Sequence, residues 1–162
     1  IEIGVELIPI ELPDIPVNDL SFILSAEGAA AFDELTRSNR DSLMVRQIEN
    51  AWPNVFRASR FIPAVEYINA NRIRNILIQK MHKVMEKVDV YLTPSWQGDN
   101  LLLTNLTGHP SVTIPNGFSK EGTPTSISII GSLFEEGEII AFAKAFQEKT
   151  EFHKKHPERF IE

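Results

Sequence analysis

The chain has 162 residues, of which 43% are apolar and 23% charged, a balance typical of a globular protein with a hydrophobic core. Its net charge of −6 argues against a nucleic-acid partner, because binding to a phosphate backbone relies on clustered Lys and Arg. The absence of cysteine excludes disulfides and thiolate metal sites and leaves the compartment open. No apolar run approaches the roughly 18 residues that span a bilayer, so we predict no membrane association.

The first residues alternate apolar side chains with glutamate and glycine, which predicts a strand with one buried face over residues 1–7. Three prolines follow, at Pro9, Pro13 and Pro16, and predict an extended connector. Because the chain begins inside a strand pattern and without Met, we expect it to be a piece of a longer protein. A processed natural start is the alternative.

Helical periodicity dominates the next part of the chain. Ser25 is suited to be the N-cap of one helix. A short helix is expected over residues 43–50, ending before Pro53. The longest helix is predicted over residues 63–88, because Pro63 suits its first turn and apolar residues recur at steps of three or four.

Three short apolar runs, each ended by Pro or Gly, predict strands at residues 90–92, 112–114 and 127–130. Turn residues between the second and third runs predict a hairpin. Between the first two runs, residues 95–110 are polar and contain a short helical pattern that ends at Gly108. Open α/β sheets usually place their ligand crevice beyond a strand's carboxyl end, so this segment is where we expect a ligand.

A last helix is predicted after two acidic residues, Glu135 and Glu136. Its expected buried stripe consists of Ile139, Ile140, Ala143 and Phe146. These elements together predict an α/β fold with a mixed β-sheet covered by helices. We find no linker or internal repeat, so residues 1–162 are expected to form a single unit.

Three stretches resemble the C-terminal part of the amidase-signature family: V-D-V-Y-L-T-P-S, T-N-L-T-G-H-P-S-V-T-I-P-N-G and T-P-T-S-I-S-I-I-G. The family pattern is D-V followed by two apolar residues and T-P, then N-x-x-G-x-P with P-x-G, then a Pro-initiated strand ending in Gly. Upstream, Tyr67, Ala70 and Arg74 add the spacing Y-x-x-A-x-x-x-R. No single one of these motifs is specific to the family, but the occurrence of all of them in this order along the chain is specific.

The resemblance implies a hydrolase that cleaves carboxamide C–N bonds of a small-molecule amide, without a cofactor. In the family, a serine nucleophile, a bridging serine and a lysine base lie in a Gly/Ser-rich stretch of the N-terminal half. Nothing in this sequence matches that stretch, so we assign no catalytic residue here. The chain alone is therefore expected to be inactive.

The best candidates for substrate contact lie in residues 95–110. Trp96 is suited to stack on or shield a ligand, while Gln97 and Asn100 are suited to hydrogen-bond an amide. His109 occupies a position where relatives usually carry an apolar residue. It is expected either to point into the active-site cleft or to make a structural hydrogen bond. The alternative for the whole segment is a loop that only packs its tryptophan.

No metal site is expected, because His153 and His156 lack nearby carboxylates with ligand spacing. Two departures from the family pattern put the substrate class in question: Ser126 replaces a frequent Gly, and Ser128 replaces a frequent Gln. A non-catalytic binding or structural module derived from the amidase fold is the alternative function, and an independent small α/β domain is a weaker third. An apolar face left exposed on such a piece would favour homo-oligomers.

Overall fold

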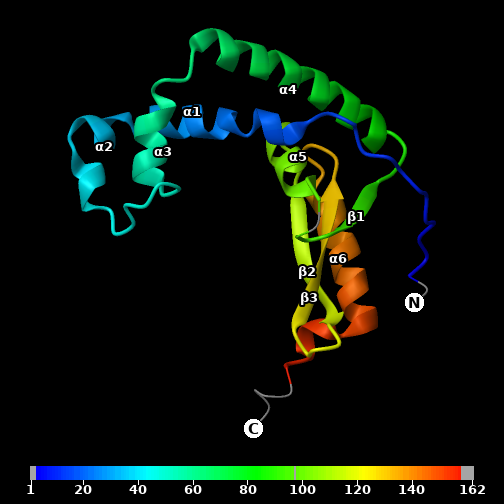
Figure 1. The fold of residues 1–162 in the computed structure, drawn as a ribbon. Helices are drawn as coiled ribbons and strands as arrows, with labels where there is room; N and C mark the ends of the chain where they lie inside the picture. Colours follow the sequence, from blue (N-terminus) through cyan, green and yellow to red (C-terminus); the bar gives the residue numbers. More distant parts are fainter. Residues whose placement is uncertain (1–2, 97, 158–162) are drawn as a thin grey trace. The chain divides into compact units, whose positions relative to one another are not determined.

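A computed structural model describes residues 3–96 and 98–157 (Figure 1). The chain divides into two compact units. Ile15–Leu77 forms the first, here named the helical unit, and Ile1–Asp14 with Ile78–Glu162 forms the second, named the sheet unit. That the whole chain behaves as a single unit stays a prediction.

The helical unit contains short helices followed by the first part of a long one. Its elements are η1 (Val17–Leu20), α1 (Phe22–Ala31), α2 (Asp33–Arg37), η2 (Arg40–Leu43), α3 (Trp52–Ser59) and the beginning of α4 (Ala64–Met85). The start predicted for the first helix is wrong, because the turn η1 leads directly into α1 and leaves Ser25 inside the helix. The long helix is confirmed within three residues of its predicted ends.

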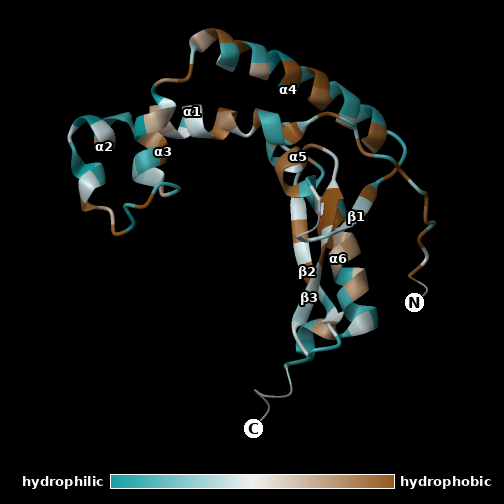
Figure 2. Ribbon diagram, viewed as in Figure 1, coloured by the Kyte–Doolittle hydropathy of each residue, from teal (hydrophilic) through white to brown (hydrophobic). Residues whose placement is uncertain are grey.

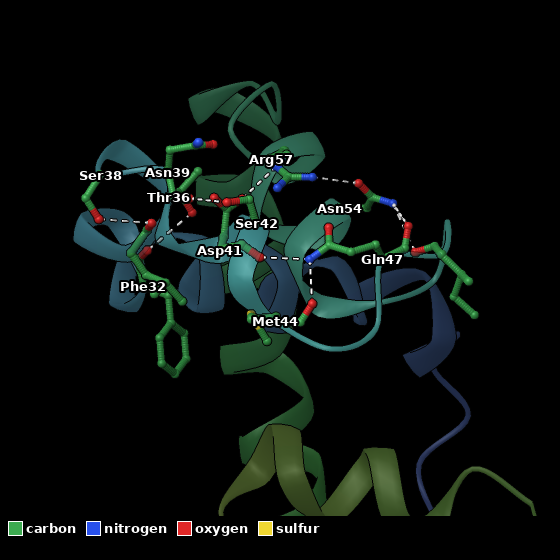
Figure 3. A network of polar contacts seen from close by, with 12 residues as sticks. Phe32, Thr36, Ser38, Asn39, Asp41, Ser42, Met44, Gln47, Asn54 and Arg57 are labelled. Carbon is green, nitrogen blue, oxygen red and sulfur yellow. Dashed lines mark hydrogen bonds and ion pairs between the residues drawn. The ribbon is translucent and has the colours of Figure 1, made fainter.

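The helix predicted over residues 43–50 is also wrong. Pro53 does not follow a helix but stands in the first turn of α3, where its missing N–H costs no hydrogen bond. Met44 is extended, with φ −67° and ψ 137°. The Gln47 side-chain amide donates to the carbonyls of Asp41 and Met44, at 2.9 and 2.8 Å (Figure 3). The Gln47 side chain thus pairs with the carbonyl of Met44, which a helix over these residues would have paired with a backbone N–H group.

An aromatic stack and an ion pair hold α3 in the helical unit. The ring of Phe56 lies 4.9 Å from that of Phe32 and 5.4 Å from that of Trp52, at separations favourable for aromatic pairs. Asp41 is only 1% exposed, and its Oδ2 lies 2.6 Å from Nε of Arg57 (Figure 3). The negative charge of the buried Asp41 carboxylate is therefore balanced by the guanidinium of Arg57 on α3.

The sheet unit contains all three predicted strands. Its elements are the end of α4, β1 (Val90–Pro94), α5 (Asn100–Thr107), β2 (Ser111–Phe118), β3 (Pro124–Gly131), α6 (Glu136–Thr150) and η3 (Phe152–Lys154). The strand order is β1-β3-β2, and both pairings are antiparallel. The predicted hairpin is β2–β3, the short helix ends at Gly108 as expected, and the α/β class with a helix-covered sheet is confirmed. The described strands are all antiparallel, however, and not of mixed direction as predicted.

The strand predicted over residues 1–7 is wrong for the part that the structure describes. Residues 3–7 form no strand, and the side chain of Leu7 is 82% exposed. Alternation alone does not make a strand, because its backbone N–H and C=O groups need a neighbouring strand as partner. Among the described residues, none pairs with this segment.

The core of the sheet unit lies between α6 and the hairpin (Figure 1). It is formed by Ile114, Ile129, Ile139 and Ala143. Of the predicted stripe on the last helix, Ile140 is exposed and Phe146 only half-buried, so the buried face is narrower than expected. Figure 2 shows the hydrophobic colour concentrated in the half of β3 toward Gly131, paling toward the hairpin turn. No helix in the described parts of the chain is long and apolar enough to cross a membrane.

Candidate functional site

Asn100 is the first residue of α5 and is tied to the sheet. Its Oδ1 accepts a hydrogen bond of 2.7 Å from the hydroxyl of Tyr91 on β1. Tyr91 is buried, and this burial raises the pKa of its phenol above the usual value. The Asn100 side chain therefore already has a protein partner for its carbonyl oxygen, which leaves its NH₂ group as the part suited to contact a ligand.

Trp96 lies in a turn after β1 and is 87% exposed. Its indole therefore presents a large apolar surface to solvent, as a ligand-stacking side chain would. Gln97 lies outside the described residues. The substrate-binding roles of both residues stay predictions.

His109 is buried, with 8% of its surface exposed, and is held by a local hydrogen bond. Its Nδ1 lies 2.8 Å from Oγ1 of Thr107, which itself donates its only proton to the carbonyl of Leu103 at 2.9 Å. His109 must therefore donate from Nδ1, which leaves its Nε2 unprotonated in the neutral ring. Burial lowers the pKa of His109, and nearby His82 lowers it further, which favours the neutral form.

The structure gives His109 the structural hydrogen bond that was one of its two expected roles. Among the three candidates that the structure describes, Trp96, Asn100 and His109, no hydrogen bond joins any two. Asn100 and His109 instead flank the two ends of α5.

A cluster of four hydroxyls, not predicted from the sequence, joins the end of β1 to the hairpin. We name Ser95, Thr113, Ser126 and Ser128 the hydroxyl cluster. Ser95 Oγ lies 2.9 Å from Ser126 Oγ and 3.1 Å from Ser128 Oγ. Ser128 Oγ lies in turn 2.9 Å from Thr113 Oγ1.

A sequence signal for this cluster existed. Ser126 and Ser128 are the two departures from the family pattern, and residues two apart on a strand share a face. The third serine comes from the end of β1, and only the strand pairing brings it to the same place, with Pro94 opposite Ile127. The cluster adjoins Trp96, so it extends the predicted substrate segment onto the sheet.

No group of three or more His, Asp or Glu side chains in the described residues is arranged to hold a metal ion. The chemistry available to these side chains is therefore hydrogen bonding by hydroxyl, amide and imidazole groups, together with apolar contact by Trp96.

The fold is that of solved amidases. One neighbour, described as the crystal structure of an amidase, has a TM-score of 0.71 at 16% identity, over 87% of this chain and 37% of that one. A second, a bacterial aryl acylamidase described as belonging to the amidase signature enzymes, has a TM-score of 0.69 at 18% identity, over 95% of this chain and 36% of that one. Identities this low establish the fold alone.

Curated relatives point to the same family, while no protein-family model matches the chain. A glutamyl-tRNA(Gln) amidotransferase subunit from Oceanobacillus iheyensis is 32% identical over 111 residues, 57% of this chain and 23% of that protein. The corresponding protein from Lactococcus lactis subsp. lactis is 37% identical over 107 residues, 54% of this chain and 22% of that protein. The chain thus spans less than a quarter of these relatives and matches the C-terminal part of an amidase-signature domain.

Proposed function

We propose that the chain is the C-terminal part of an amidase-type hydrolase that cleaves carboxamide C–N bonds. Its Ser/Ser/Lys triad would lie in sequence upstream of these 162 residues, so the chain alone would be inactive. The substrate of the intact enzyme would be a small-molecule amide, with no nucleic-acid or membrane partner.

The observation that carries this proposal is the overlap of two independent matches. The relatives named amidotransferase share about a third of their residues with this chain over its matched part, and the solved amidases share its fold over nearly all of it. The family's catalytic stretch has no counterpart in the sequence. The name amidotransferase applies to those relatives. For this chain we propose only the hydrolysis of carboxamide C–N bonds that is common to the family.

Inactivity of the chain is tested with purified 162-residue protein. We expect no turnover of a panel of amides and esters and no labelling by a fluorophosphonate, because no serine here is paired with a lysine or histidine base in the described residues. Turnover that is lost when one serine of this chain is replaced would overturn this part of the proposal.

The coding sequence upstream of Ile1 tests the enzymatic part. A lysine followed by a Gly/Ser-rich serine pair would support the hydrolase, and the longer protein should then hydrolyse amides. A start codon directly before Ile1 would contradict it and favour a non-catalytic module that keeps the amidase fold.

A further inference from the structure

We propose that Ser95 donates a hydrogen bond to the carbonyl oxygen of a bound carboxamide. This inference rests on the proposed function for its choice of ligand. It goes further in naming a residue, an atom and a direction of hydrogen bonding. The hydroxyl cluster carries it.

The direction follows from counting protons. Each hydroxyl has one proton to donate and two lone pairs to accept with. Ser126 and Ser128 both donate to Ser95. Since Ser128 has then spent its proton, the bond between Ser128 and Thr113 must be donated by Thr113.

Three of the four protons are therefore donated within the cluster, and two of them are donated to Ser95. Its oxygen accepts two hydrogen bonds, which occupy both lone pairs. Its own proton has no acceptor among the described residues, and its side chain is only half-buried. The one donor that the cluster offers to a ligand is thus the Ser95 O–H, and hydrogen bonds accepted by a hydroxyl strengthen it as a donor.

The same count excludes another role. A serine nucleophile attacks with a lone pair of its oxygen, and those of Ser95 are engaged. No titratable side chain is hydrogen-bonded to the cluster in the described residues, so no base is in place to activate it. Ser95 is suited to hold a substrate and not to attack it.

The charge of the chain selects among acceptor ligands. A carboxylate also accepts a hydrogen bond from a hydroxyl. The chain carries a net charge of −6, however. Like-charge repulsion disfavours a carboxylate there, so a neutral carbonyl is the better ligand. The exposed Trp96, the next residue, adds apolar surface for the rest of such a molecule.

The test is a titration of the isotope-labelled 162-residue protein with benzamide. Binding is monitored by the backbone amide signals of residues 93 and 95–99 and by the indole signal of Trp96. We expect saturable shifts centred on Ser95. Ser95→Ala should weaken binding by about 2- to 12-fold, the worth of one hydrogen bond. Ser95→Thr, which keeps the hydroxyl, should restore it.

Ser111→Ala is the control. It removes an exposed hydroxyl of β2 that lies outside the cluster, so it should bind within about twofold of the parent. Equal losses in Ser95→Ala and Ser111→Ala, or absence of any shift at Ser95, would overturn the proposal. Benzoate binding as tightly as benzamide would overturn the choice of ligand. These are binding measurements, so their failure is distinguishable from failure of the proposed hydrolase, which the activity assays report.

Discussion

The hydroxyl of Tyr91 on β1 donates a 2.7 Å hydrogen bond to Oδ1 of Asn100, the first residue of α5. The two residues are separated by the turn that carries Trp96. Their hydrogen bond therefore closes the loop that we assign to substrate contact and orients Asn100 by a buried partner on the sheet.

Tyr91→Phe should destabilise the protein by about 1 kcal/mol at neutral pH, because it removes one partly buried hydrogen bond and keeps the ring. Tyr67→Phe is the matched control. The Tyr67 hydroxyl donates to Glu27 at 3.1 Å in an exposed setting, and its loss should cost less. Denaturant unfolding measures both. Equal costs would mean that the Tyr91 hydrogen bond adds nothing beyond a surface contact.

The raised pKa of the Tyr91 phenol predicts that the stability of the protein depends on pH. Burial raises the pKa of Tyr91 in the folded protein, whereas in the unfolded chain it is about 10. The folded state thus holds the proton more tightly, and stability should fall as the pH rises above the unfolded value. Stability profiles from pH 8 to 11 should show a smaller alkaline loss for Tyr91→Phe than for the parent.

Gly131→Ala should be strongly destabilising. A Cβ at this position would lie 2.5 Å from Cγ2 of Ile139, which is buried where α6 packs on the sheet. Overpacking of this kind costs about 1–3 kcal/mol. In a double-mutant cycle with Ile139→Ala, Gly131→Ala should cost less stability in the Ile139→Ala background than in the parent protein. Additive costs would show that the clash is relieved elsewhere.

Gly108→Ala should destabilise by about 1 kcal/mol, since Gly108 ends α5 with a φ of 81° that a Cβ disfavours. The nearest atom to an added Cβ, on Leu133, is at an ordinary 3.8 Å, so the cost is backbone strain and not a clash. Gly137→Ala, in the open first turn of α6, should instead be neutral or stabilising by about 0.5 kcal/mol. Thermal unfolding measures both variants. Equal destabilisation of Gly108→Ala and Gly137→Ala would contradict the left-handed conformation of Gly108.

Arg57→Leu should cost about 3–5 kcal/mol, because it leaves the buried carboxylate of Asp41 without its cation. The double variant with Asp41→Leu should recover part of this loss. Arg37→Ala breaks an exposed pair with Asp33 and should cost less than about 1 kcal/mol. If circular dichroism melts show equal effects for Arg57→Leu and Arg37→Ala, the buried pair does not support the helical unit.

Self-association is expected at high concentration. Several large apolar side chains are nearly fully exposed, among them Phe61 and Phe134, and β1 and β2 are edge strands of the described sheet. Sedimentation equilibrium should show an average mass that rises with concentration. A clean monomer that also fails to bind an apolar dye would contradict this.

The strands and the short helix could be predicted because their signals are local. Runs such as residues 127–130 are apolar and β-branched, and Gly108 with Pro110 can only end a helix. The segment at residues 43–50 could not be predicted, because its structure depends on the Gln47 amide reaching two carbonyls. Its apolar residues gave no sign of that contact.

The sequence by itself determined the family resemblance, the α/β class and the segment that carries Trp96 and Asn100, since these depend on residue type and spacing along the chain. Only the tertiary structure decided that residues 3–7 form no strand, since a strand requires a partner distant in sequence. It also decided the hydroxyl cluster, because Ser95 meets Ser126 and Ser128 across the β1–β3 pairing. Hydrogen bonds between residues more than thirty positions apart depend on strand register, which spacing along the chain does not contain.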